Sequence, residues 1–237
     1  MIEYLVNENF WMWENTLAMN AQKSWFLPLV VALATQNFYR RTHRRILAFV
    51  AFTLVMEYIT TDMEWTLLLD PLSNGPLYYI FGPFLLFFLW RIFVDYFYPE
   101  KRGYWRWWPV LVYAVLTVAN ALWGDGFRNF PSMTVGLYSF SGIIFCLGYF
   151  FALLRNPTVF HLERLPMFWV SAGFLIYFAG NFLLWVGLSF INYDKDFFDS
   201  IYRINGVVTI FLNLTLAIAI FLQPTHDVQD EVPKTVS

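Results

Sequence analysis

Long apolar stretches alternate with short polar ones along this chain. Seven stretches approach the twenty or so mostly apolar residues that a helix needs to cross a bilayer. The connectors between them are short and rich in Gly, Pro, Asn and Asp, which favour turns. The pattern therefore predicts an all-α polytopic membrane protein with seven transmembrane helices in antiparallel hairpins. The expected helices lie near residues 22–39, 46–68, 76–98, 107–123, 135–154, 167–191 and 204–223.

Both ends of the chain lack such stretches, which leaves residues 21–223 as the transmembrane domain. Residues 1–20 carry acidic residues among the apolar ones, so we expect a short helix that lies in the membrane interface rather than a signal peptide. Residues 224–237 are polar and contain proline, and we expect a disordered cytoplasmic tail. Such a tail is too short for a kinase or cyclase domain, so a signal would have to pass to another chain.

The distribution of Lys and Arg predicts the orientation. Ten of the fifteen basic residues fall on one side of the expected bundle and four on the other, and Arg91 lies within the third span. Because basic loops remain in the cytoplasm, we expect the N-terminus outside and the C-terminus inside. Carboxylates collect on the outer side, which indicates either exclusion of positive charge or a vestibule that attracts cations.

Composition agrees with a membrane protein and narrows its partners. Hydrophobic residues make up 59% and charged residues 14% of the chain, against roughly 45–50% and about 25% in soluble domains. The net charge of -2 and the lack of an extended basic stripe argue against nucleic acid as a partner. Cys146 is the single cysteine and the three histidines are isolated in the sequence, so we expect no metal site and no cofactor.

Glu57 is the most informative residue because it lies near the centre of the second span. A charged group at that depth costs about 2.5–3.5 kcal/mol unless it is paired, neutralised or hydrated. One interpretation pairs Glu57 with Arg91 of the next span; the alternative turns Arg91 toward the cytoplasm beside Asp95 and leaves Glu57 protonated. Asp62 and Glu64, near the outer end of the same helix, either line a polar entrance or are simply solvated.

The sixth span combines small and polar residues. Three glycines recur at intervals of seven and share one helix face, which favours close approach of a neighbouring helix. Tyr177 and Asn181 flank that face, and Asn213 of the seventh span is their expected hydrogen-bond partner. We interpret the face mainly as a packing seam, with a ligand site as the alternative. The glycines are Gly173, Gly180 and Gly187.

The run RRTHRR marks the cytoplasmic side. Its arginines are expected to contact anionic lipid headgroups or the acidic surface of a cytoplasmic or membrane partner. They are Arg40, Arg41, Arg44 and Arg45.

The sequence contains no nucleotide-binding, zinc-protease or serine-hydrolase motif, so it does not indicate catalysis. The seventh span also lacks the lysine that a retinal Schiff base requires.

The sixth span reads P-x-F-W followed by G-x-L-x-Y-F-x-G-N, within a run that extends from about residue 135 to 223. This run resembles a group of bacterial seven-helix integral membrane proteins that look like free-standing versions of the membrane sensor modules of histidine kinases. We therefore expect a multi-pass protein of the cell inner membrane. The resemblance implies a sensor of this architecture, but no activity and no functional residues.

Three functions are consistent with these features. The favoured one is a sensor or signalling subunit that acts through a separate cytoplasmic or membrane protein. The first alternative is a small-molecule or ion transporter that uses Glu57, and the second is a lipid-binding or lipid-modifying protein.

Overall fold

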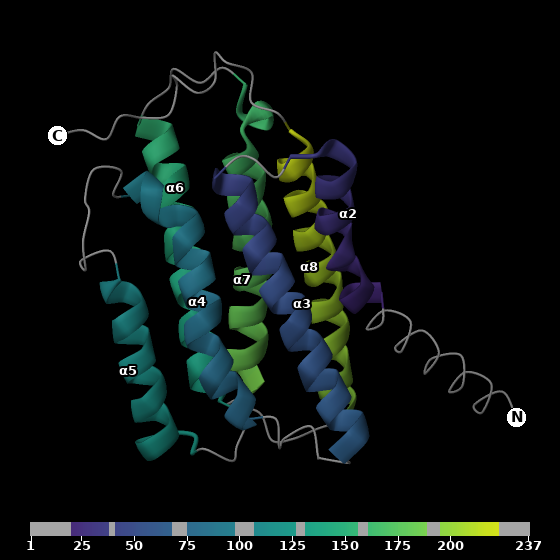
Figure 1. Ribbon diagram of the computed structural model, residues 1–237. Helices are drawn as coiled ribbons and strands as arrows, with labels where there is room; N and C mark the ends of the chain where they lie inside the picture. Colours follow the sequence, from purple (N-terminus) through teal and green to yellow (C-terminus); the bar gives the residue numbers. More distant parts are fainter. Residues whose placement is uncertain are drawn as a thin grey trace, which may run out of the picture.

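A computed structural model describes residues 20–37, 41–67, 75–97, 107–126, 131–155, 161–188 and 195–222. These residues form a helical bundle, and no strand occurs among them (Figure 1). Each predicted span overlaps one helix of the bundle. The helices are α2 (Phe26–Thr35), α3 (Arg41–Leu67), α4 (Gly75–Phe97), α5 (Trp108–Trp123), α6 (Ser132–Arg155), the 3-10 turn η3 (Leu162–Arg164), α7 (Pro166–Leu188) and α8 (Lys195–Phe221).

Four helices of the described part are long and apolar enough to cross a membrane, which indicates a membrane protein. They are α4, α6, α7 and α8, over Leu77–Val94, Ser132–Arg155, Pro166–Leu184 and Arg203–Phe221. α5 is apolar but has 16 residues, and α2 has 10, which is half the length of an ordinary crossing. Seven crossings and the orientation of the termini therefore stay predictions.

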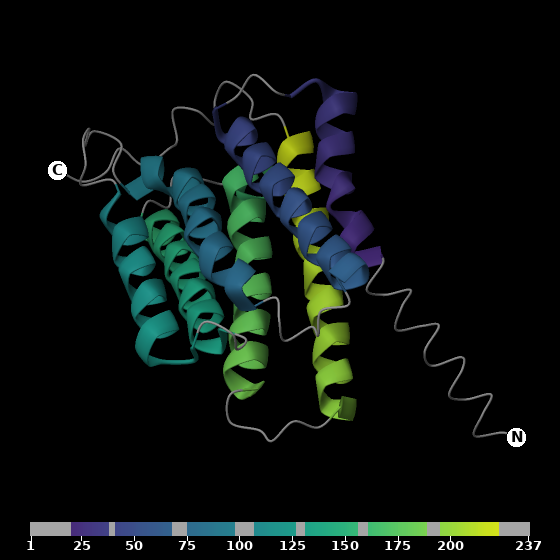
Figure 2. The same cartoon turned by 60° about the horizontal axis from the view of Figure 1, so that its bottom comes forward.

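Consecutive helices run antiparallel, and α7 lies near the centre of the bundle (Figure 1). α7 packs most extensively against α6 and α8, while α2 packs against α8 and so brings the N-terminal part of the bundle beside its last helix. α5 contacts α4 and α6 and lies at the edge of the bundle, farthest from α2 (Figure 2).

One half of the bundle is filled by aromatic rings that contact one another. This half contains the N-terminal parts of α3 and α7 and the C-terminal part of α4, which lie in the upper part of Figure 1. Phe174 of α7 is fully buried, and its ring centre lies 5.1 Å from that of Phe49 and 6.4 Å from that of Phe93. We call this group the aromatic core. It comprises Phe49, Trp90, Phe93, Phe97, Phe145 and Phe174.

Glycines allow α7 to approach its neighbours closely. A Cβ atom on Gly173 would collide with the Thr215 hydroxyl of α8, and one on Gly142 of α6 would collide with the Phe178 ring of α7. At Gly180 the nearest atom, Cγ1 of Val208 on α8, would lie 3.3 Å away. Two of the three predicted seam glycines thus face α8. The surroundings of the third, Gly187, lie outside the described part of the chain.

Candidate functional site

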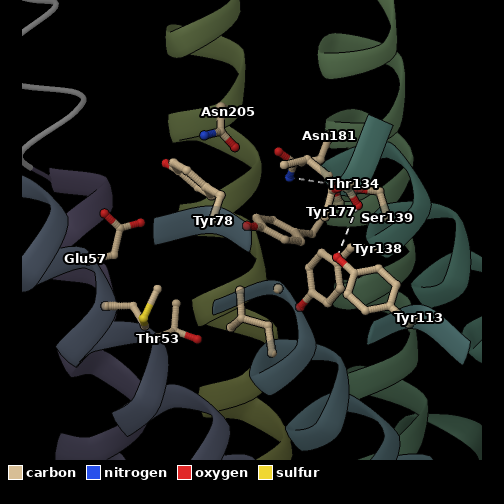
Figure 3. Close-up of a pocket in the computed structure, with 14 residues that line it drawn as sticks. Thr53, Glu57, Tyr78, Tyr113, Thr134, Tyr138, Ser139, Tyr177, Asn181 and Asn205 are labelled. Atoms are coloured by element: carbon tan, nitrogen blue, oxygen red, sulfur yellow. Dashed lines mark hydrogen bonds between the residues drawn. The ribbon is translucent and has the colours of Figure 1, made fainter. Parts of the chain in front are cut away.

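A cavity of about 140 Å³ lies in the half of the bundle away from the aromatic core (Figure 3). Each water takes about 30 Å³ in the liquid, so the cavity has room for roughly five. Side chains from six helices, α3 to α8, line it. They are Thr53, Met56, Glu57, Tyr78, Gly82, Leu85, Tyr113, Thr134, Val135, Tyr138, Ser139, Tyr177, Asn181 and Asn205.

The cavity lies toward the α3–α4, α5–α6 and α7–α8 connections. Tyr78 comes from the first turn of α4 and Thr134 from the first turn of α6, next to these connections. The charge distribution predicts that the same connections face the outside of the cell. The predicted orientation therefore places the cavity in the outer half of the protein.

Glu57 is the one charged residue among the described residues that line the cavity. Its side chain is half-buried on α3, and Figure 3 shows its carboxylate across the cavity from Tyr113, Tyr138 and Tyr177. The cavity thus combines a carboxylate on one side with several phenol rings on the other.

Four tyrosines from four different helices surround the space. They are Tyr78 of α4, Tyr113 of α5, Tyr138 of α6 and Tyr177 of α7. The Tyr113 hydroxyl donates a hydrogen bond to the Thr134 carbonyl at 3.2 Å. Gly82 makes room for this tyrosine, because a Cβ at position 82 would lie 2.7 Å from the Tyr113 hydroxyl oxygen. A glycine in mid-helix is thus explained by the approach of a cavity-lining ring.

Three lining polar atoms are buried without a hydrogen-bond partner among the described residues: Tyr138 Oη, Ser139 Oγ and Asn205 Oδ1. Tyr138 is 8% and Ser139 1% exposed. A buried polar group with no partner costs about 1–3 kcal/mol, so such groups in native proteins are normally matched by water or a ligand. Three of them around one cavity favour a polar occupant.

A hydrogen-bond network holds the α5–α6 hairpin beside the cavity. Asn120 Nδ2 donates to Asp125 Oδ2 at 3.0 Å and to Thr134 Oγ1 at 3.0 Å. The Asp125 carboxylate also accepts from the Met133 backbone N–H at 3.1 Å, which satisfies an amide in the first turn of α6. The Tyr79 hydroxyl joins the hairpin to α4 by donating to the Gly126 carbonyl at 3.1 Å. These bonds fix the start of α6 relative to α4 and α5, and Tyr138 and Ser139 lie one turn further along α6.

The cavity brings together three of the residues singled out in the sequence: Glu57, Tyr177 and Asn181. Asn181 is buried, and its Nδ2 donates to the Tyr177 carbonyl one turn earlier, at 3.0 Å. The predicted hydrogen bond from Asn213 to this pair is wrong. Asn213 is fully buried, and its Nδ2 donates to Ser24 Oγ at 2.8 Å because its side of α8 faces the segment before α2.

Asn205, two turns before Asn213 on α8, is the asparagine of α8 that lines the cavity. Sequence reasoning missed it, together with Tyr138 and Ser139. The signal was the polar pair Tyr138-Ser139 early in an apolar helix, since hydroxyl groups within a span often face other helices or a cavity. The sequence does not say which neighbour they face.

Arg91 lies elsewhere on α4. Its guanidinium carbon is 5.8 Å from the centre of the Trp107 ring, within the range of a cation–π contact. Arg91 is six residues beyond the cavity-lining Leu85, which is about 9 Å along the helix. The Glu57–Arg91 pair stays a prediction. Asp62, Glu64 and Asp95 lie on α3 and α4, but their side chains are outside the described part.

The basic run lies at the end of the bundle opposite the cavity. Arg41 and Arg44 are exposed, whereas Arg45 is half-buried and Arg40 lies outside the described residues. His43 between them is buried, with Nδ1 3.2 Å from the Asn37 carbonyl oxygen. Asn37 Nδ2 in turn donates to the Ile220 carbonyl at 3.0 Å, so this connection is fastened to the end of α8.

Within the described ranges, no group of three or more His, Cys, Asp or Glu residues is arranged to hold a metal ion. Comparisons of this chain with protein-family models, with curated proteins and with solved structures found no match.

Proposed function

We propose that this protein is a membrane receptor subunit that binds a small polar molecule in its cavity and passes the information to a separate cytoplasmic or membrane protein. The observation that carries the proposal is the set of three buried polar atoms without partners that line one cavity beside Glu57. Such a cavity is an ordinary form of small-molecule site, with apolar walls and a few convergent polar groups.

The aromatic core favours a receptor over a transporter. A transported molecule would have to pass beyond the cavity toward the α4–α5 and α6–α7 connections, where rings of α3, α4, α6 and α7 fill the interior. Opening such a path would separate ring pairs that are worth about 0.5–1.5 kcal/mol each beyond their burial. Binding and release from one side requires no such rearrangement.

α7 offers a physical route for the signal. Tyr177 and Asn181 line the cavity, while Phe174, less than a turn before Tyr177, contacts the aromatic core. The rings of Phe174 and Phe178 are stacked, with centres 5.5 Å apart. A ligand that shifts α7 at the cavity would therefore also shift the contacts of α7 with α3 and α4. At the far end, the exposed Arg41 and Arg44 offer a basic surface to an acidic partner or to lipid headgroups.

Transport is the second candidate, because Glu57 places an ionisable group within a predicted span. Ligand binding and uptake can be measured with the same preparation, and they separate the two functions.

The experiment uses the full chain in lipid nanodiscs and in proteoliposomes. Small polar compounds are screened for a rise in melting temperature, in wild type and in Ser139→Trp, which fills the cavity. The matched control is Leu147→Trp on the same helix, at a position that is 52% exposed on the bundle surface. Asn205→Leu preserves side-chain volume and removes the unpartnered amide oxygen, so it serves if Ser139→Trp does not fold.

We expect compounds that stabilise wild type and Leu147→Trp but neither cavity variant, with no uptake into proteoliposomes. If a stabilising compound is taken up and the uptake depends on Glu57, the protein is a transporter and not a receptor. Stabilisation that is equal in all four proteins would show that the cavity is not the binding site.

A further inference from the structure

The chemistry of the lining residues also defines the class of ligand, given the proposed function that the cavity binds one. We propose that the ligand is a small organic cation with a protonated amine, whose ammonium group lies between Glu57 and the tyrosines and whose carbon part contacts the apolar wall.

Charge is the first argument. Glu57 is the one charged side chain among the described lining residues, and no Lys or Arg of those ranges lines the cavity. An anion placed beside a half-buried carboxylate is repelled more strongly than it would be in water, because the surroundings screen the charges less. A cation is attracted by the same carboxylate for the same reason. The site therefore selects against acids and in favour of positively charged ligands.

The rings give the second argument. Tyr78, Tyr113, Tyr138 and Tyr177 enter the cavity from four helices, and Figure 3 shows three of them across from the Glu57 carboxylate. The face of a phenol ring carries partial negative charge and attracts a cation within about 6 Å of its centre. Aromatic rings surround ammonium groups in many binding sites, and a nearby carboxylate adds charge attraction.

Hydrogen bonding gives the third argument. Asn205 Oδ1 can only accept a hydrogen bond, and the hydroxyl oxygens of Tyr138 and Ser139 can accept as well as donate. All three are buried without a partner among the described residues. A primary ammonium has three N–H donors and no acceptor, so it matches a site whose unpartnered atoms are all oxygens.

Size indicates that the cation is organic. The cavity of about 140 Å³ holds roughly five waters, whereas a bare metal ion needs less than one water's volume. Met56, Leu85 and Val135 supply an apolar part of the wall, which a hydrated inorganic ion would not contact favourably. A short carbon chain or ring fits there.

The test compares three probes of nearly equal size on the full chain in nanodiscs at pH 7. n-Butylamine is protonated at this pH, 1-butanol is neutral and butyrate is an anion. Binding is measured by ligand-observed NMR titration in wild type, Glu57→Gln, Asn205→Leu and Glu163→Gln. The last variant removes a carboxylate from the exposed residue Glu163 and is the charge-matched control.

We expect n-butylammonium to bind wild type and Glu163→Gln at least tenfold more tightly than either other probe. Glu57→Gln should lose at least tenfold of this affinity and Asn205→Leu several-fold, while butanol binding should barely change. Melting curves of the ligand-free variants show whether each is folded. If Glu57→Gln is not folded, the amine proposal is still tested by the affinity of Asn205→Leu and by the order in which the three probes bind wild type.

Three results would overturn the amine assignment in different ways. If butanol and butylammonium bind equally and Glu57→Gln has no effect, the cavity binds a ligand of another chemical class. Stabilisation by sodium ions that depends on Glu57, with no additional effect of butylammonium, would make the site one for an inorganic cation. If no probe binds and the broader compound screen also finds nothing, both the amine and the receptor are wrong.

Discussion

The two halves of the bundle both use aromatic residues, but with opposite consequences. In the aromatic core, rings without polar atoms, such as Phe49, Phe93 and Phe174, contact one another and fill the interior. In the cavity half, four tyrosines line the space, and the hydroxyl of Tyr138 is left buried without a partner among the described residues. The aromatic core is thus filled by rings that contact one another, whereas the cavity half contains space lined by rings that carry hydroxyl groups.

α7 takes part in both halves. This helix contributes Phe174 to the aromatic core and Tyr177 and Asn181 to the cavity, within two turns. Glycines let it approach α8 and α6 closely enough to join both halves. Variants on α7 and its neighbours should therefore differ in effect according to the half in which they lie.

The largest effect is expected from Phe174→Ala in the aromatic core. Phe174 is fully buried, and its loss should cost about 3 kcal/mol of unfolding free energy. This is the low end for Phe→Ala, because the unfolded helices remain in lipid and only the packing contribution is lost. Unfolding by SDS in mixed micelles measures it. Phe211→Ala, at a position that is 38% exposed, is the matched control and should cost less than half as much.

The next effect concerns the two described seam glycines of α7. Gly173→Ala would push a methyl group into Thr215, which should cost about 1–2 kcal/mol. Gly180→Ala meets Val208 Cγ1 at 3.3 Å and gains helix propensity, so it should lie within about 0.5 kcal/mol of wild type. The same SDS titration compares the two. Equal losses would mean that α7 is not packed more tightly beside the aromatic core than beside the cavity.

A smaller effect is expected from removing single hydroxyls around the cavity. Tyr113→Phe should cost about 1 kcal/mol, because the Tyr113 hydroxyl donates to the Thr134 carbonyl at 3.2 Å. Tyr138→Phe should cost nothing or stabilise the ligand-free protein slightly, because it removes a buried oxygen without a partner in the described ranges. Differential melting of the two variants tests this. A loss in Tyr138→Phe as large as that in Tyr113→Phe would show that the Tyr138 hydroxyl is bonded in the free protein.

The smallest effect is expected outside the membrane, at Glu163 in η3. A hydrogen bond from its own backbone amide lowers the pKa of this carboxyl, and His161, with Nδ1 3.1 Å from Oε1, lowers it further. Because the folded-state pKa is lowered, the carboxylate favours the folded protein above the ordinary pKa, and this contribution is lost as the pH falls through the lowered value. An NMR titration should show a pKa below the ordinary one that rises in His161→Ala. The melting temperature should barely change, because the group is exposed.

The helices were predictable because their signals are local. Apolar runs bounded by Gly, Pro, Asn and Asp predicted a segment for each of α2 to α8. In lipid the backbone groups of a helix must form their hydrogen bonds within that helix, so each apolar run specifies its own helix. α2 was predicted too long: residues 22–39 were expected, whereas the helix ends at Thr35 and Gln36 adopts a left-handed conformation with φ of 53°. Asn37, which follows the break, donates a hydrogen bond to the Ile220 carbonyl, a long-range contact that a local pattern does not contain.

The sequence by itself determined which residues carry unusual chemistry, and only the tertiary structure decided which of them meet. Glu57, Tyr177 and Asn181 stood out because polar groups are costly in an apolar helix. Their convergence with Asn205 rather than Asn213 depends on the rotation and depth of α8 against α7. Contacts such as that of Gly173 with Thr215 set this rotation and depth. Such packing joins residues that are distant in the chain, whereas the period of a single helix is a local property.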